Sequence, residues 1–205
     1  MLGLNYNQAE AMEFDFQPLS SLCRIEVNLA TGFGSGTIRG TFGKMGGSID
    51  FYPENPSLSN GKILLSSRSL RFGHAKVAYD AHATDWMDSS SHPEIIFDLV
   101  RLSSFSWHGK ELRADAEGIL DLKGNRSRIK IPLSVRYFRG ERRKFEGKTG
   151  DLLRLEGLLT LQRSEFGLAA GILRNEIMED IFVRISITGA SNEIRPFLPS
   201  RLFRR

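Results

Sequence analysis

The sequence contains only one cysteine in 205 residues and has no long run of apolar residues. Because Cys23 has no second cysteine to pair with, no disulfide can form within the chain. Its place on the apolar side of an alternating run indicates a buried, inert thiol. No apolar run approaches the roughly 18 residues of a membrane-spanning helix. Residues 1–12 lack the basic start and continuous apolar stretch of a secretory signal, so we expect the chain to stay where it is made.

The composition indicates one globular domain that is rich in β-structure. Hydrophobic residues make up 40% of the chain and charged residues 25%, which is ordinary for a soluble protein. The 14 phenylalanines and 20 glycines are more than a helical bundle would need. A chain of this length can bury a sizeable core or close a barrel around a ligand.

Apolar and polar residues alternate with period two through most of the sequence, which is typical of strands with one buried face. In one such run, Ile129 and Ile131 alternate with Arg128 and Lys130. The expected strands are 13–16 continuing through 22–30, 35–43, 46–52, 62–70, 94–102, 111–123, 128–137, 153–161 and 181–188. Their hairpin spacing predicts an all-β fold, an antiparallel up-and-down barrel of about eight strands.

One segment, residues 74–91, interrupts this alternation. Its alanines favour short helical turns, and Asp85 or Asp88 would cap one of them. The His92-Pro93 pair ends the interruption, because a residue before proline is pushed towards extended conformations. We expect a short helical insert across one mouth of the barrel.

The strand at 111–123 suggests what the interior contains. Its apolar face carries the small residues Ala114, Ala116 and Gly118 between larger ones. A barrel of about eight strands is wide enough either to be filled by side chains or to hold one small ligand, so small inward residues favour a cavity. Gly118→Phe is therefore expected to abolish ligand retention in a folded protein. The alternative is a filled barrel that serves as an interaction module.

Four motifs, in order along the chain, resemble those of the YceI-like family. They are Gly40-Thr41-Phe42 with Gly47-Ser48-Ile49-Asp50-Phe51-Tyr52-Pro53-Glu54-Asn55-Pro56, then Asp85-Trp86-Met87-Asp88 with His92-Pro93-Glu94-Ile95-Ile96-Phe97, then Gly118-Ile119-Leu120-Asp121-Leu122-Lys123-Gly124, and Arg163-Ser164-Glu165-Phe166-Gly167. The resemblance implies a lipocalin-like barrel that encloses a polyisoprenoid or another long-chain lipid. Many members of that family are exported. If a signal peptide has been removed from this chain, we expect a periplasmic protein; if not, we expect a cytoplasmic one.

The chain departs from the family pattern in two places. Relatives carry an arginine, an aspartate and a histidine-leucine pair where this chain has residues 78–84, and a threonine-lysine-proline turn where it has 125–128. Head-group contacts made by those family residues therefore do not transfer to this chain. The resemblance leaves the identity of the lipid open.

These observations together predict a barrel domain at 13–188, an N-terminal extension at 1–12 and a basic tail at 189–205. The predicted activity is non-covalent binding and carriage or storage of a long-chain lipid, without catalysis, cofactor or metal. The expected ligand-binding residues are apolar positions of the barrel wall, with Trp86 and Met87 at a lid: Phe42, Ile49, Phe51, Ile63, Leu65, Trp86, Met87, Ile95, Phe97, Leu99, Ala116, Gly118, Leu120, Leu133, Leu159, Leu161 and Phe166.

Positive charge is concentrated in one loop and in the tail. The loop 136–148 holds six basic and two acidic residues, and the tail adds Arg195, Arg201, Arg204 and Arg205. Both would suit an anionic membrane surface or a lipid phosphate, although a solvated loop and a ragged tail are the more ordinary explanation of the charge. We expect no nucleic-acid partner, because no recognised binding motif accompanies the charge. A homodimer is compatible with the sequence.

An enzyme or metal protein is the main rival. His74, His82 and His92 lie with several aspartates in the insert, and such a cluster could bind a metal or act in acid-base catalysis. Their spacing does not match a zinc-hydrolase helix, which needs two histidines four residues apart. The segment 32–36 is glycine-rich like a phosphate loop, but an expected strand follows it, which favours a hairpin.

Overall fold

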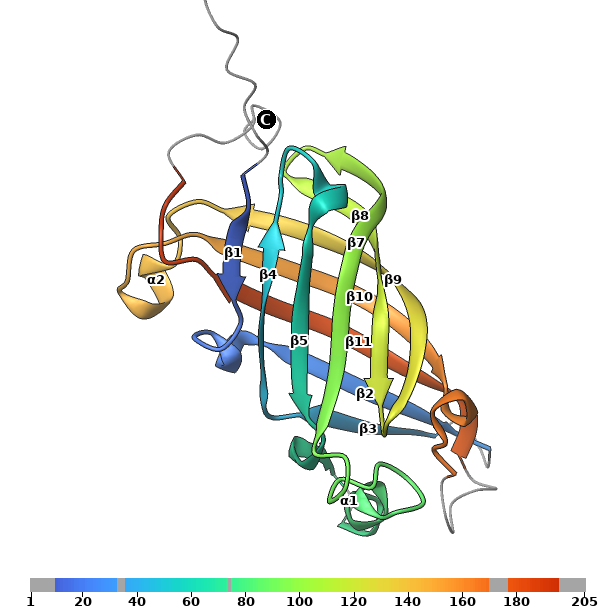
Figure 1. Cartoon of the computed structure of the whole chain (residues 1–205). Coiled ribbons are helices and arrows are strands. Elements are labelled where there is room, and N and C mark those ends of the chain that lie inside the picture. Colours follow the sequence, from blue (N-terminus) through green and yellow to red (C-terminus); the bar gives the residue numbers. More distant parts are fainter. Residues whose placement is uncertain (1–9, 33–35, 74, 170–176, 196–205) are drawn as a thin grey trace, which may run out of the picture.

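The computed structural model describes residues 10–32, 36–73, 75–169 and 177–195. Their strands pair into one antiparallel sheet in the order β1-β4-β5-β7-β8-β9-β10-β11-β2-β3-β6. Because β1 also pairs with β11, the run from β1 to β11 closes into an eight-stranded barrel (Figure 1). The strands are β1 (Met12–Asp15), β2 (Arg24–Thr31), β3 (Thr37–Phe42), β4 (Met45–Phe51), β5 (Asn60–Ser66), β6 (Leu70–Phe72), β7 (Glu94–His108), β8 (Glu111–Leu122), β9 (Asn125–Phe138), β10 (Leu152–Gln162) and β11 (Ile177–Ala190).

Three strands of the barrel wall are each divided into two pieces. β1 pairs with β4 while its continuation β2 pairs with β3, and β3 in turn pairs with β6 while β4 pairs with β5. Each of the pairs β1 and β2, β3 and β4, and β5 and β6 therefore acts as one bent wall strand. Counted in this way, every strand neighbours the next one along the chain. The predicted antiparallel up-and-down order is confirmed.

Three of the expected strands differ clearly from the structure. The expected strand 62–70 is two strands, β5 and β6, separated by a 3₁₀ turn at Ser67–Ser69. The expected run from 13 to 30 is broken by a 3₁₀ turn, η1 (Ser20–Leu22), and β7 runs on to His108 instead of ending at residue 102. The pairing of β7 with β8 shifts register between Leu99 and Arg101 and again between Ser103 and Ser106. Each bulge moves side chains from one face to the other, so the period-two pattern stops while the strand continues.

The helices are short and lie at the barrel's ends. There are two described α-helices, α1 (Ala75–His82) and α2 (Arg143–Glu146). Besides η1, the described residues form the 3₁₀ turns η2 (Pro56–Leu58), η3 (Ser67–Ser69) and η4 (Arg163–Phe166). α1 lies below the lower end of the barrel in Figure 1, which agrees with the expected helical insert. His74, the first residue of that insert, lies outside the described residues. No helix in the described part of the chain has the length and apolar character needed to cross a bilayer.

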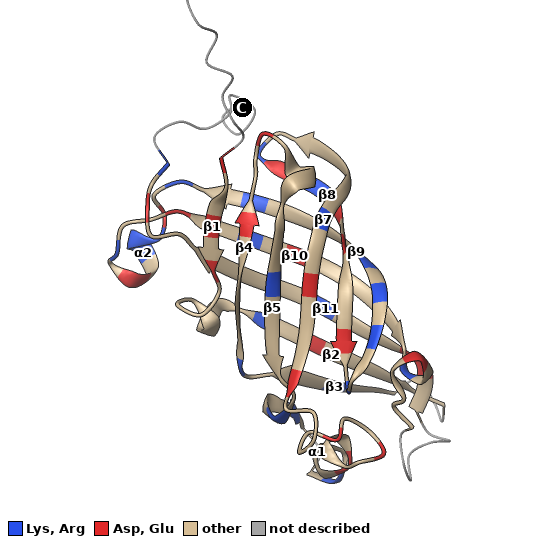
Figure 2. Ribbon diagram, in the orientation of Figure 1, with Lys and Arg blue, Asp and Glu red and all other residues tan. Residues whose placement is uncertain are grey.

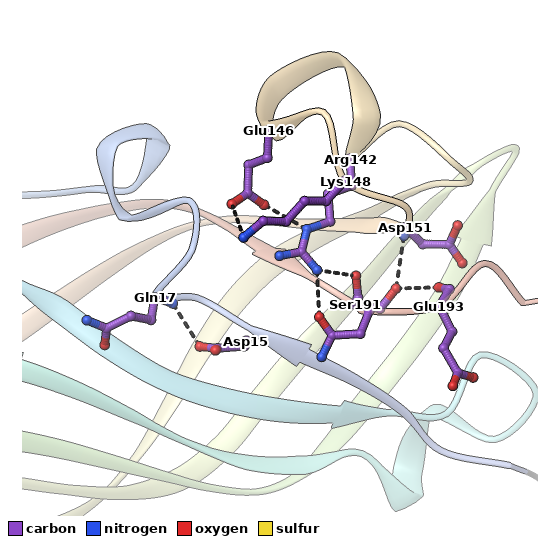
Figure 3. A network of polar contacts seen from close by, with 9 residues as sticks. Asp15, Gln17, Arg142, Glu146, Lys148, Asp151, Ser191 and Glu193 are labelled. Carbon is purple, nitrogen blue, oxygen red and sulfur yellow. Dashed lines mark hydrogen bonds and ion pairs between the residues drawn. The ribbon is translucent and has the colours of Figure 1, made fainter.

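A buried polar network lies at the upper end of the barrel, where α2 and the β7–β8 turn lie (Figure 1). Figure 3 shows the part of it around Arg142, Asp151 and Ser191. Asp151 is fully buried and accepts hydrogen bonds from the Tyr137 hydroxyl, from the Gly140 amide at 2.7 Å and from the Arg195 amide at 3.0 Å. Burial, together with this bond to Asp151, raises the pKa of Tyr137, which keeps its hydroxyl a donor. The network ties β9, β10 and the C-terminal segment together.

Charged side chains occupy the outside of the wall. Figure 2 shows basic and acidic residues spaced along the strands. Lys62 pairs with Asp98 of the neighbouring strand at 3.2 Å, and Arg101 pairs with Glu117 at 2.7 Å. Such exposed pairs contribute at most about 1 kcal/mol each. Their importance is that they fix which face of each strand is outside, and so leave an apolar interior.

Candidate functional site

Two clusters of buried side chains fill the two ends of the barrel. The upper cluster is built around Phe14, Phe51, Leu112 and Leu153, none of which is exposed to solvent. The lower cluster includes Leu29 of β2, Leu70 of β6, Phe166 of η4, Leu168, and the predicted lid residues Trp86 and Met87. Each end of the barrel therefore contains a cluster of packed apolar side chains.

Between these clusters lies a ring of residues that pack against both. This ring, called the waist below, consists of Phe42, Leu65, Phe97, Ile129, Leu159 and Val183. Each points inward in a closed barrel and yet is only partly buried. A partly buried side chain on the inner face borders open space rather than a neighbouring side chain. The waist is where the interior is hollow.

The hollow is an apolar cavity running through the waist. The space open to the centres of water-sized spheres is about 160 Å³, whereas one water needs only about 10–15 Å³ on that measure. Polar residues enter the lining at three positions, Ser48, Lys62 and Glu156. Lys62 and Glu156 direct their side chains outward, to pair with Asp98 and Arg154, and Ser48 shares the face of Lys62. A cavity lined in this way excludes water and accepts hydrocarbon.

Most of the residues expected to contact a ligand line this cavity. The structure places the following in its wall: Phe42, Ile49, Phe51, Ile63, Leu65, Trp86, Met87, Ile95, Phe97, Leu99, Ala116, Leu120, Leu133, Leu159 and Leu161. Trp86 and Met87 are both buried and belong to the cluster at the lower end. Phe166 is fully buried in that cluster and does not reach the cavity wall.

Gly118 also lies outside the cavity wall, for a physical reason. A Cβ atom on Gly118 would lie 2.6 Å from Cε2 of Phe97 and 2.3 Å from the carbonyl oxygen of Asp98. The glycine thus makes room for the Phe97 ring and for the neighbouring backbone, not for a ligand. Gly118→Phe would displace β7, so it cannot block the lumen in an intact fold as the sequence suggested.

The sequence analysis did not select every wall residue. The structure adds apolar positions mainly from β2, β6, β9 and β11: Ile25, Val27, Gly61, Leu70, Phe72, Leu102, Leu122, Ile129, Ile131, Val135, Leu155, Gly157, Leu168, Ile181, Val183, Ile185 and Ile187. The signal for most of them is the same alternation that identified the strands, since they lie on the inner faces of those strands. Leu168 follows η4 and carries no such signal.

The histidines and aspartates of the insert do not form a metal site in the part of the chain that the structure describes. Both ring nitrogens of His82 form structural hydrogen bonds, Nδ1 with the Ser89 hydroxyl at 2.9 Å and Nε2 with the Leu70 carbonyl at 3.0 Å. Among the residues whose placement is described, no three of His, Cys, Asp or Glu gather closely enough to hold a metal ion. The Cys23 thiol is partly buried near Thr188, and burial raises its pKa, which disfavours the reactive thiolate.

The glycine-rich segment 32–36 joins two paired strands. Residues 33–35 lie outside the described residues, but on either side of them β2 and β3 pair antiparallel, with Ala30 opposite Thr37. The Thr31 amide donates to the Gly36 carbonyl at 3.1 Å. A strand and not a helix follows the segment, so the hairpin interpretation is confirmed.

Comparison with known proteins identifies the fold. The family model described as YceI-like domain matches residues 14–189. The BcnA protein of Burkholderia cenocepacia aligns with a TM-score of 0.65 at 15% identity, covering 82% of this chain and 97% of that one. A polyisoprenoid binding domain from Saccharophagus degradans, implicated in plant cell wall breakdown, aligns with a TM-score of 0.64 at 13% identity, covering 89% and 99%.

A third solved structure, the YceI protein of Campylobacter jejuni, aligns with a TM-score of 0.61 at 14% identity, covering 75% of this chain and 85% of that one. No curated protein matches the sequence. At these identities the solved structures establish a shared fold. Because the family model extends over nearly the whole barrel, from β1 to β11, the chain belongs to the YceI-like family.

Proposed function

We propose that this protein binds a long-chain lipid, a polyisoprenoid, non-covalently in the barrel cavity and carries or stores it. The observation that carries the proposal is the waist, where six inward-facing apolar side chains border open space between two packed clusters. Membership of the YceI-like family supports it, as does the likeness to a polyisoprenoid binding domain. No step of such a function makes or breaks a covalent bond, so we propose a binding protein and not an enzyme.

The energetics favour a hydrocarbon guest. Each methylene moved from water into an apolar cavity gains about 0.8 kcal/mol, and an isoprene unit has several such groups. A long lipid chain needs more volume than the cavity has with the waist side chains in their present rotamers. Because those side chains have open space beside them, they can change rotamer to admit the chain at a modest cost. The charged side chains among the lining residues, Lys62 and Glu156, point out of the barrel, so they cannot bind a polar head group inside the cavity. The head group of the lipid would therefore lie outside the waist.

Organic extraction followed by mass spectrometry tests this function. Protein purified without detergent is expected to release a polyprenyl or acyl compound in an amount comparable to the protein. Protein stripped of lipid is expected to take up undecaprenol offered in detergent micelles. A bound divalent ion without lipid would favour the metal alternative. Failure of the stripped, folded protein to take up either undecaprenol or a fatty acid would contradict the proposal.

A second proposal concerns the loop around α2, as a contact with an anionic membrane surface. Phe145, at the tip of this loop, is 57% exposed and lies beside Arg143 and the exposed side chains of Lys144 and Lys148. Lys144 pairs with Glu141 and Lys148 with Glu146, but both lysines stay open to solvent. An apolar tip flanked by cations suits the interface of an anionic bilayer. Arg142 does not take part, since it is buried and pairs with Glu146 at 2.7 Å. The tail at 196–205 lies outside the described residues, and a homodimer stays a prediction.

Removing two of these charges is expected to weaken binding to vesicles. Each cation near an anionic surface contributes about 1 kcal/mol, so Arg143→Gln with Lys144→Gln should reduce binding to phosphatidylglycerol vesicles by roughly 25-fold. The matched control is Arg128→Gln with Lys130→Gln, which removes two exposed cations from the outer face of β9. Vesicle co-sedimentation at low salt measures both. Equal losses in the two double variants would show that net charge, and not this loop, is responsible.

A further inference from the structure

Phe97 occupies a special position in the waist. It lies on β7, opposite Ile63 of β5 and Leu120 of β8, and packs against both the upper and the lower cluster. It is only partly buried and lines the cavity. One side of the ring therefore borders the open space in which a ligand would lie.

The other side of the ring lies over a glycine. Gly118 is on the inner face of β8, in line with Ala116 and Leu120, yet it does not reach the cavity. A Cβ atom on Gly118 would lie 2.6 Å from Cε2 and 2.7 Å from Cζ of Phe97, closer than real contacts allow. The ring thus fills the space that a side chain on β8 would otherwise take, and it separates that space from the cavity.

The other aromatic residue of the waist lacks this arrangement. Among the glycines of the described residues, none would bring an added Cβ atom against the Phe42 ring as its nearest neighbour, so no glycine leaves an empty wall position behind that ring. The ring of Phe72 also lies over a glycine, Gly40. Phe72, however, is buried in the lower cluster and is not part of the waist. Phe97 is the described waist residue whose removal would join a new volume to the cavity without exposing the packed ends.

We propose that Phe97 sets the amount of hydrocarbon that the cavity accepts, an inference that rests on the proposed function. The wall around it is fixed by the closed hydrogen-bonded sheet, so the volume available to a guest depends on the side chains that project inward. With a smaller residue at position 97, the space over Gly118 becomes part of the cavity. The barrel then holds a longer or more folded polyprenyl chain.

Competition between polyprenols of two lengths tests this role. Wild type, Phe97→Leu and Phe97→Ala, each stripped of lipid, are offered equal amounts of geranylgeraniol and undecaprenol in detergent, and the bound ratio is read by mass spectrometry. One methylene more or less in an apolar pocket changes binding roughly 10- to 200-fold. The ratio of long to short chain is therefore expected to rise at least about tenfold in Phe97→Ala and by less in Phe97→Leu.

The control is Phe182→Leu, which trims an exposed ring on the outer face of β11 and is expected to leave the ratio unchanged. Near-ultraviolet circular dichroism establishes which variants are folded, and Phe97→Leu decides the question if Phe97→Ala does not fold. A wild-type ratio in a folded Phe97 variant would overturn this inference alone. Absence of any polyprenol binding by wild type would overturn the proposed function and this inference with it.

Discussion

Leu159→Trp is expected to abolish retention of a long-chain lipid while the barrel stays folded. Leu159 lies in the waist, opposite Val183 of β11, and lines the cavity. The added ring atoms would enter the open space beside Leu159, so the overpacking cost should stay near the low end of about 1–3 kcal/mol. Displacing three or four methylenes of a guest would cost roughly 2–3 kcal/mol, which weakens binding about fiftyfold or more.

The neighbouring residue provides a matched control. Leu158 is on the outer face of the same strand and 63% exposed, so Leu158→Trp makes the same chemical change outside the barrel. Lipid extracted per mole of protein, and uptake of undecaprenol by stripped protein, are compared for the two variants and wild type. Leu158→Trp should match wild type. Equal retention by both variants would show that the guest does not occupy the waist.

Asp151→Ala is expected to lower the free energy of unfolding by about 3–5 kcal/mol, because it leaves several donors at the upper end without an acceptor. Those donors are the Tyr137 hydroxyl and the amides of Gly140 and Arg195. The Asp151 amide itself donates to the Ser191 hydroxyl at 2.9 Å, a bond that the variant keeps. Urea unfolding followed by circular dichroism measures the loss.

The control for this variant is Asp15→Ala at the same end of the barrel (Figure 3). Asp15 is exposed, and its carboxylate accepts one hydrogen bond, from the Gln17 amide at 2.8 Å. Its removal should cost less than about 1 kcal/mol. If Asp151→Ala cost no more than Asp15→Ala, the network would not hold the C-terminal segment to the barrel. Asp151 itself gave no signal in the sequence, since a single aspartate after a loop is ordinary.

Much of the candidate site could be predicted from the strand pattern. In a closed barrel one face of every strand must point inward, so alternation marks most wall positions, although fewer than half of the wall residues were selected from the sequence as ligand contacts. Gly118 shows where this reasoning ends. Its inward position follows from the alternation, but Phe97 and Gly118 are diagonal neighbours on different strands, and only the register of β7 against β8 brings the ring over the glycine. Small residues in a strand do not reveal whether they make room for a ligand or for another side chain.

The sequence by itself determined the antiparallel barrel, its approximate strand number and its apolar interior, because side-chain alternation and turn residues are local properties of the chain. The tertiary structure alone decided three things: that β1 closes on β11, that Asp151 gathers donors from the end of β9 and from the C-terminal segment, and that the interior stays hollow at the waist. Each depends on distances between residues far apart in the chain. Whether inward side chains fill a barrel depends on how side chains from opposite walls pack against one another. Those side chains come together only when the sheet has closed.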